Sequence, residues 1–312
     1  MQTPVLFLVF NRPQTTELVL QAIRAAAPKQ LFVAADGPRP TNPTDSPQCK
    51  EVLSIIERGI DWDCKTEYLV RKTNLGCGKA VSSAISWFFN VVPEGIILED
   101  DCRPAAQFFP FCSELLERYR DEPRVAQIGG FNGQFGQKRG SASYFFSRYF
   151  HIWGWASWRR AWEGYDFAMR DYRDFIMEGG LESLFDRQVV REFWRYNFDS
   201  VISGQATTWD YQWAYHNFKR DALAIVPNVN MVENTGFGAG ATHTFDRNRK
   251  LPPADGKPCG ELIHPRFVLA NHQADDFTYR NHLKLGRFHE LKQFAKRVLR
   301  IGRLRRGRIG PL

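Results

Sequence analysis

Short apolar runs alternate with helix-patterned segments over the first 130 residues, and this order constrains the fold more than any other feature of the chain. The runs are typical of buried strands, because they are short and bounded by turn residues. Such an alternation predicts an α/β fold with a mainly parallel sheet and helices on both faces. We expect strands at Pro4–Phe10, Leu31–Ala35, Glu67–Val70, Gly95–Leu98 and Val125–Ile128. We expect helices at Thr15–Ala26, Lys79–Asn90 and Phe108–Tyr119, and a further helix that follows the loop to Pro47 and ends at Arg58.

Polar segments follow four of these strands at the point where each strand ends: Asn11-Arg12, Asp36-Gly37, Arg71–Asn74 and Glu99–Asp101. In open parallel sheets, ligands bind beyond the carboxyl ends of the strands. The four segments are far apart in the sequence, but we expect them to converge at one edge of the sheet. A functional site is therefore predicted at that edge.

The last of these segments places three acids, Glu99, Asp100 and Asp101, directly after an apolar strand. Three like charges repel one another, so a cation is expected beside them, and carboxylate oxygens suit a hard divalent ion such as Mg²⁺ or Mn²⁺. Such an ion serves chemistry on phosphate-bearing substrates. The alternative is a solvated acidic turn, and the convergence of the four strand ends favours the metal site.

The alternation stops after Gly129, and we divide the chain into an α/β half at 1–130, a second half of the same domain at 131–283 and a tail at 284–312. Aromatic residues gather between Phe145 and Trp213. In the second half we expect strands at Tyr144–Phe146 and Leu223–Val226 and helices at Leu184–Ile202 and Tyr211–Arg220.

The net charge of +8 is confined to the tail, which holds ten Lys and Arg and one Glu, leaving 32 basic and 33 acidic residues elsewhere. Apolar residues of the tail have helical spacing from Leu291 to Leu299. A basic amphipathic helix of this kind can lie on an anionic membrane surface. A solvated extension and a helix docked on the main domain are the alternatives. No companion motif indicates nucleic-acid binding.

Six cysteines occur without the short spacing of a zinc or redox motif, which favours a reduced, intracellular chain. The run Pro4–Phe10 follows no basic region, so we expect no signal peptide, and no apolar run is long enough to span a membrane. The predicted location is cytoplasmic, with the tail able to hold the chain on the inner membrane surface.

The chain carries four motifs in the order Leu8–Pro13, Ala35–Gly37, Leu98–Asp101 and Trp209–Trp213. This ordered set resembles the nucleotide-diphospho-sugar glycosyltransferases of the GT-A fold. The similarity is greatest to bacterial members sometimes labelled haemolysin-like, and it extends more distantly to N-acetylglucosaminyltransferase I. The resemblance implies that 1–130 binds a nucleotide sugar and that 131–283 binds the acceptor and carries the catalytic base.

The resemblance also divides the acidic, DXD-like motif into separate roles. It implies that Asp101 binds Mn²⁺ or Mg²⁺ and that Asp100 contacts the ribose of the donor. A cation there would stabilise the negative charge that grows on the departing diphosphate. Diphosphate oxygens and water can complete its ligand shell. Glu99 is expected to support the motif by hydrogen bonds to nearby backbone.

Four further residues are candidates for holding the nucleotide. By resemblance, Asp36 accepts a hydrogen bond from the base, and Arg12 holds the diphosphate, for which a guanidinium is well suited. Asn74 lies at the end of the third strand, and Lys79 opens a helix after a glycine turn, which suits an anion. The alternatives are a turn former for Asp36, a surface loop residue for Arg12 and a solvated helix face for Lys79.

Asp210 is the candidate catalytic base, because an inverting transfer needs a carboxylate to take the proton of the acceptor hydroxyl. It lies between Trp209 and Tyr211, which could desolvate it or stack on a sugar ring. The alternative is an aspartate that caps a helix starting at Tyr211.

Three features of the second half have roles that the residues leave open. His243 is a candidate second metal ligand or an exposed loop residue. The glycine-rich stretch Gly236–Gly240 could close over the donor and exclude water. The aromatic residues from Trp153 to Trp158 line an acceptor site or form a packing core.

These observations favour a metal-dependent, inverting glycosyltransferase that moves a hexosyl or N-acetylhexosaminyl group from a UDP-sugar to a glycan or lipid-linked acceptor. One alternative is a sugar-nucleotide nucleotidyltransferase, although such enzymes usually carry a glycine- and basic-rich phosphate loop where this chain has Phe10–Pro13. The other is a non-catalytic protein that binds carbohydrate or membrane.

Overall fold

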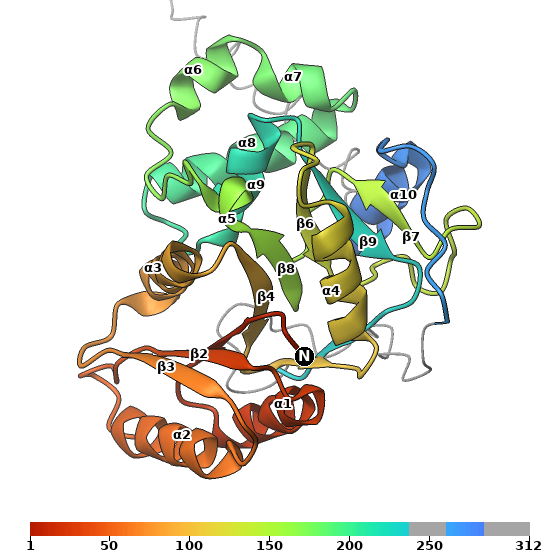
Figure 1. Ribbon diagram of the computed structural model, residues 1–312. Coiled ribbons are helices and arrows are strands. Elements are labelled where there is room, and N and C mark those ends of the chain that lie inside the picture. Colours follow the sequence, from red (N-terminus) through yellow and green to blue (C-terminus); the bar gives the residue numbers. More distant parts are fainter. Residues whose placement is uncertain (237–259, 284–312) are drawn as a thin grey trace, which may run out of the picture.

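Within residues 1–236 and 260–283, which the computed structural model describes, eight strands form one sheet in the order β3–β2–β1–β4–β8–β6–β9–β7 (Figure 1). This confirms the predicted α/β fold class, a large and mostly parallel sheet flanked by helices. The strands are β1 (Val5–Val9), β2 (Gln30–Ala35), β3 (Lys65–Val70), β4 (Glu94–Glu99), β6 (Val125–Gly129), β7 (Tyr144–Ser147), β8 (Trp155–Trp158) and β9 (Leu223–Pro227).

The first half has the predicted alternation, with β1 pairing in parallel with both β2 and β4, and β2 with β3. All five residues of β1 are buried, because neighbouring strands and helices cover it on every side. Phe88 of α3 packs edge-on against Phe32 of β2, with ring centroids 5.0 Å apart. The helices are α1 (Pro13–Ala26), α2 (Asp45–Gly59), α3 (Gly76–Val91) and α4 (Phe108–Arg118).

The sequence did not indicate β8, which lies antiparallel between β4 and β6. Ala156 of this strand faces Ile96 on one side and Ile128 on the other. The fifth predicted strand, β6, therefore runs parallel to β4 but is not its neighbour. Because Trp155 and Trp158 are completely buried, these two rings form core packing and do not line an acceptor site.

The second half adds a helical layer with its own aromatic core, in which the Trp194 and Phe198 rings stack 5.6 Å apart. The long helix begins at Gln188, four residues after the predicted start at Leu184. The helices are α5 (Arg159–Trp162), α6 (Tyr172–Met177), α7 (Gly180–Leu184), α8 (Gln188–Ile202), α9 (Asp210–Phe218), α10 (His272–Phe277) and a π-helical turn at Thr278–His282.

A two-stranded antiparallel ribbon joins the two halves of the chain beside the acidic motif. It pairs β5 (Cys102–Pro104), which begins immediately after Asp101, with β10 (Val232–Asn234) from the second half. The residues that follow β10 are thereby brought next to the three acids.

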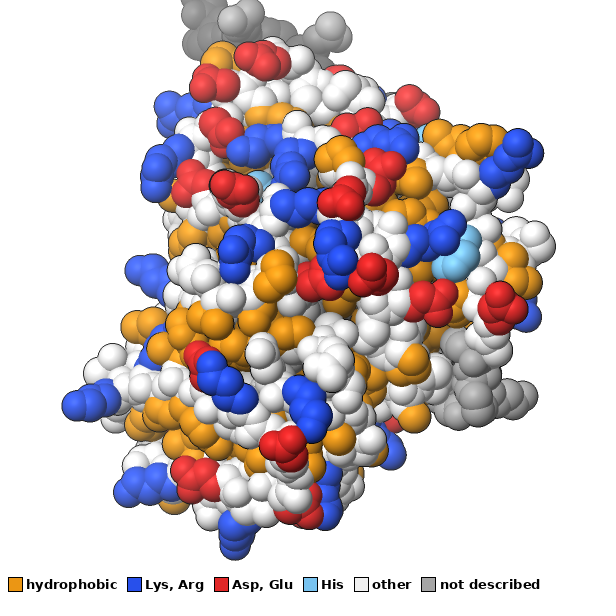
Figure 2. All heavy atoms as spheres, viewed as in Figure 1, with side chains coloured by type: hydrophobic (Ala, Val, Ile, Leu, Met, Phe, Trp, Pro, Cys, Tyr) orange, Lys and Arg blue, Asp and Glu red, His pale blue; other side chains and the backbone are white. Residues whose placement is uncertain are grey.

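The surface drawn in Figure 2 carries basic and acidic side chains interspersed, without a patch of one sign. Many are paired, as in the contacts of Arg120 with Glu94 and of Arg124 with Glu122. Cys49, Cys64, Cys77, Cys102 and Cys112, the cysteines in the described part of the chain, are free thiols. No helix among the described residues is long and apolar enough to cross a membrane. The tail from residue 284 lies outside the described residues.

Candidate functional site

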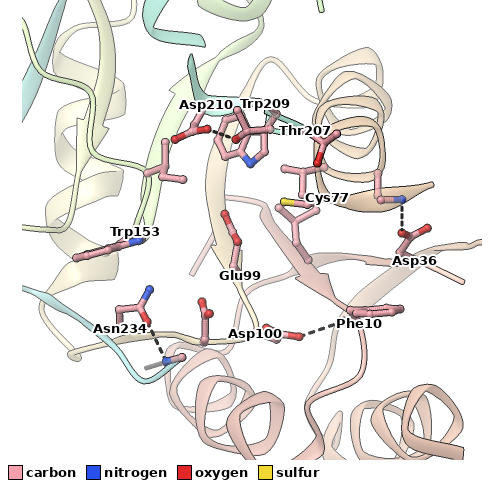
Figure 3. Close-up of a pocket in the computed structure, with 18 of the residues that line it drawn as sticks. Phe10, Asp36, Cys77, Glu99, Asp100, Trp153, Thr207, Trp209, Asp210 and Asn234 are labelled. Atoms are coloured by element: carbon pink, nitrogen blue, oxygen red, sulfur yellow. Dashed lines mark hydrogen bonds between the residues drawn. The ribbon is translucent and has the colours of Figure 1, made fainter. Parts of the chain in front are cut away.

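A cavity of about 1620 Å³ opens at the carboxyl ends of β1, β2 and β4 (Figure 3). It is larger than the roughly 300–1,000 Å³ of an ordinary small-molecule pocket, so it has room for two substrates. The predicted convergence of the strand ends is therefore present. Six predicted site residues line the cavity: Arg12, Asp36, Asn74, Asp100, Asp101 and Asp210.

The floor of the cavity is an ion-pair cluster centred on Arg12. Its Nη1 donates to Oδ2 of Asp101 at 2.6 Å and to Oδ1 of Asp100 at 3.2 Å. The backbone N–H of Phe10, at the end of β1, donates to the other oxygen of Asp100 at 3.1 Å. The adjacent ends of β1 and β4 thus hold both aspartates in fixed positions.

Burial dominates the electrostatics of this cluster. Removal from water raises the pKa of Asp100 to about 7, and the neighbouring charge of Asp101 adds to this rise while Arg12 opposes it.

Glu99, the last residue of β4, does not have the supporting role expected for it. Its Oε1 is buried and has no hydrogen-bond partner among the described residues, so the expected bond to nearby backbone is absent there. Figure 3 shows its side chain between Asp100 and Asp210. Burial, followed by the charges of Asp101, Asp100 and Asp210, raises the pKa of Glu99 well above its usual range.

The residues after β10 close the cluster from the other half of the chain. Thr235 donates to the backbone oxygen of Asp101 from its N–H at 2.7 Å and from its hydroxyl at 3.1 Å. Gly236 packs so closely that a Cβ there would lie 2.1 Å from Oδ2 of Asp101. The glycine-rich stretch therefore starts against the acidic motif, which sequence reasoning did not foresee. His243 and residues 237–240 lie outside the described residues.

The cluster has the chemistry of a divalent-cation site that needs further ligands. Among residues 1–236 and 260–283, no group of three or more His, Cys, Asp and Glu side chains is arranged to hold a metal ion unaided. Asp101 nevertheless offers a carboxylate at the cavity wall, with an unpartnered acid oxygen of Glu99 nearby. A hard divalent ion fits such oxygen ligands if substrate oxygens and water complete its shell. The residues present therefore fit Mn²⁺ or Mg²⁺.

Asp36 joins the end of β2 to the start of α3. Its carboxylate accepts from Asn74 Nδ2 at 3.0 Å and from the N–H groups of Leu75 and Gly76 at 3.0–3.2 Å. These N–H groups lie at a helix start, where they lack intrahelical partners. Burial raises the pKa of Asp36 although these donors oppose it. Asp36 and Asn74 therefore shape this end of the cavity together. Lys79, by contrast, is exposed on α3 and is not part of the cavity lining.

An anchor that sequence reasoning missed is Asp45, the first residue of α2, whose side chain is completely buried. It accepts hydrogen bonds from Asn11 and Asn42 at 2.8 and 2.9 Å and from both ends of the Arg39 guanidinium at 2.6 and 2.9 Å. Asn11, Arg39 and Asn42 line the cavity, so one carboxylate orders three of its polar residues.

We expect Asp45→Asn to lower the free energy of unfolding by about 2–4 kcal/mol, because a buried charge-paired acceptor is lost. The Arg39 hydrogen bonds lower the pKa of Asp45 to about 2. The ionised carboxylate of Asp45 therefore stabilises the fold at pH values above the ordinary carboxyl pKa of about 4. This stabilisation is lost as the pH falls toward 2. Urea unfolding at pH 7 and pH 3 should show a smaller difference between the two proteins at pH 3.

The matched control is Asp61→Asn, since Asp61 pairs with Arg24 at a site where both side chains are about half exposed. Surface pairs of this kind contribute at most about 1 kcal/mol. Equal destabilisation by the two variants would contradict the anchoring role of Asp45.

Asp210 lies across the cavity from Asp100, as Figure 3 shows. It is the first residue of α9, and no side chain caps this helix, so the alternative role as a helix cap does not hold. The hydroxyl of Thr208 contacts Oδ1 of Asp210. Trp209 beside it is buried and stacks on Trp155, which fixes the start of the helix.

The remaining wall comes from α8 and from the segment before β8. Phe193, Tyr196, Asn197 and Ser200 line the cavity with the spacing of one helical face, a signal that the sequence contained. Tyr196 is 70% exposed. Trp153 also lines the cavity, as Figure 3 shows, so one ring of the predicted aromatic cluster faces the site.

No protein-family model matches this chain, and no curated protein matches its sequence. Solved structures with partial similarity include the following three. HddC from Yersinia pseudotuberculosis is 10% identical over 51% of this chain and 78% of its own, with a TM-score of 0.30. UDP-glucose pyrophosphorylase complexed with UDP-glucose is 12% identical over 47% of this chain and 62% of its own, with a TM-score of 0.26.

The third, 4-diphosphocytidyl-2C-methyl-D-erythritol synthase from Anaerococcus prevotii, is 8% identical over 60% of this chain and 85% of its own, with a TM-score of 0.29. TM-scores this low do not establish a common activity. The function must therefore be inferred from the cavity itself.

Proposed function

We propose that this protein is a metal-dependent, inverting glycosyltransferase that uses a nucleotide-diphosphate sugar, with UDP-sugars favoured, and a saccharide or lipid-linked saccharide acceptor. One observation carries the proposal. Asp100 from the first half and Asp210 from the second half lie on opposite sides of one cavity of about 1620 Å³, which Asp101 also lines. This arrangement can hold a diphosphate near one wall and an acceptor hydroxyl near the other.

The first half binds the donor in this proposal. Asp101 holds Mn²⁺ or Mg²⁺, which when bound neutralises the charge that develops on the diphosphate. Arg12 reaches the same cluster and is suited to diphosphate oxygens. Asp100 is assigned to the ribose. The polar end of the cavity at Asp36 and Asn74 is assigned to the base, next to the residues that Asp45 orders.

The second half binds the acceptor and supplies the base. Asp210 takes the proton from the acceptor hydroxyl as its oxygen attacks the sugar carbon and the bond to the diphosphate breaks on the opposite side. Tyr196 and Trp153 offer aromatic faces to sugar rings. The additional metal ligand His243 and the membrane contact of 284–312 stay predictions. Leu283, the last residue before the tail that the structure describes, lines the cavity.

The test is incubation of the full chain with UDP-, GDP- and dTDP-sugars and Mn²⁺, with chromatographic detection of products. We expect slow release of nucleoside diphosphate even without acceptor, because water can replace the acceptor hydroxyl, and loss of this release with a chelator. Formation of pyrophosphate or turnover of a nucleoside triphosphate would show a nucleotidyltransferase instead. Binding of sugar nucleotides without any turnover would indicate the non-catalytic alternative.

A further inference from the structure

The position of Arg12 has a consequence for how a metal ion could enter the site. Its Nη1 lies 2.6 Å from Oδ2 of Asp101 and 3.2 Å from Oδ1 of Asp100. A cation bound to that oxygen of Asp101 would occupy the same space as the guanidinium nitrogen. The two cations also repel each other at such a distance. Arg12 and a metal ion therefore compete for one carboxylate.

The surroundings of Asp101 leave little room to avoid this competition. Its side chain is only 14% exposed. The thiol of Cys102 donates to the other oxygen, Oδ1, at 3.4 Å, and Gly236 packs against Oδ2. Both carboxylate oxygens of Asp101 therefore already have neighbours at contact distance.

We propose that Arg12 is a specificity-determining residue that makes the site bind the metal–diphosphate complex in preference to the free metal ion. Before substrate arrives, the guanidinium occupies the cation position on Asp100 and Asp101. A metal–diphosphate complex brings anionic oxygens to which the guanidinium can turn, while the ion takes its place on Asp101. A free metal ion brings no anionic oxygens, so Arg12 stays in place and competes with the ion for Asp101.

The structure allows the side chain to make this exchange while the backbone stays in place. The Arg12 carbonyl accepts from the Thr16 N–H at 3.0 Å, which ties the backbone to the first turn of α1. Pro13 at the start of the helix further restricts the chain. The side chain is 26% exposed and lines the cavity that would hold the diphosphate. Rotation about side-chain bonds is therefore sufficient.

This inference deepens the proposed function, since it assumes that the cavity binds a metal and a diphosphate. It is tested by calorimetric titration of the full chain with Mn²⁺, without nucleotide and with UDP, GDP or dTDP. Wild type should bind Mn²⁺ alone weakly and gain affinity when a suitable nucleotide is present. Arg12→Gln should bind Mn²⁺ alone about tenfold more tightly and gain about tenfold less from the nucleotide, as expected for a coupling between two ligands.

Two variants accompany the test. Arg24→Gln removes a guanidinium from a surface pair with Asp61 and should titrate like wild type. Arg12→Lys keeps a positive charge near the aspartates but loses the planar fork, and it should bind Mn²⁺ alone with an affinity between those of wild type and Arg12→Gln. Thermal unfolding without metal checks that each variant is folded.

The outcomes separate this proposal from the proposed function. The role of Arg12 would be overturned if Arg12→Gln and wild type bound Mn²⁺ alone with equal affinity while Asp101→Asn did not bind it. The metal site itself would then stand. If neither wild type nor any variant bound Mn²⁺ with any of the nucleotides, both the role of Arg12 and the proposed metal-dependent function would be overturned.

Discussion

Asp210→Asn is expected to slow sugar transfer strongly and leave donor binding unchanged. Asparagine keeps the shape of the side chain but cannot accept the proton of the acceptor hydroxyl. General-base catalysis contributes about 10²–10⁴-fold to a rate, so kcat should fall by about that factor. The donor side of the cavity should be unaffected, because Asp210 lies across the cavity from Asp100. Transfer rates and the Kd for a sugar nucleotide measure the two effects separately.

The fold at Asp210 should survive the change. No side-chain cap stabilises α9 at its start, and the neighbouring Trp209 is held by its stacking on Trp155. The control is Asp63→Asn, because Asp63 is 92% exposed and contacts only Lys29 among the pairs described. It should retain full activity. Transfer by Asp210→Asn at the wild-type rate would remove Asp210 from the mechanism.

The parallel half of the fold could be predicted because its signals are local. The strands β1, β2 and β4 are apolar runs that end at polar or turn residues, and each helix between the strands shows its own periodicity. The carboxyl ends of parallel strands share one edge, so the order of strands and polar residues was sufficient to assign Arg12, Asp36 and Asp101 to one site.

The insertion of β8 could not be predicted, because the sequence Trp155–Trp158 shows no strand alternation. Its conformation is set by pairing with β4 and β6, whose residues are remote in the sequence. Tertiary pairing of this kind overrides local preference. The burial of Trp155 and Trp158 decides between the two roles that the sequence left open for them, in favour of core packing.

Asp45 and Glu99 show why the details of the site could not be predicted from the sequence. Asp45 follows a loop rich in proline, where an acid ordinarily faces solvent, and its role comes from burial beneath Arg39 and Asn42. Glu99 was expected to bond nearby backbone, but the strand end directs it between Asp100 and Asp210. Both outcomes depend on the neighbours of each carboxylate in space, which sequence spacing does not reveal.

Asp101→Asn is the second change with a large expected effect. It removes the negative charge that would hold the metal ion but keeps an oxygen that can accept from Arg12. Loss of one preorganised group that stabilises developing charge costs about 10²–10³-fold in kcat. The variant should also lose the response to Mn²⁺, which a titration of activity against metal concentration measures. Asp61→Asn, at a surface pair, should show the wild-type response.

The loss should not come from unfolding. Thr235 contacts the backbone oxygen of Asp101, which the substitution leaves in place, so the ribbon of β5 and β10 keeps its anchor. Asp100 also retains Arg12 and the Phe10 N–H. Thermal unfolding in the absence of metal should therefore differ little from wild type. Activation by the same Mn²⁺ concentrations in Asp101→Asn and wild type would place the ion elsewhere, and a folded variant without activation would identify Asp101 as its ligand.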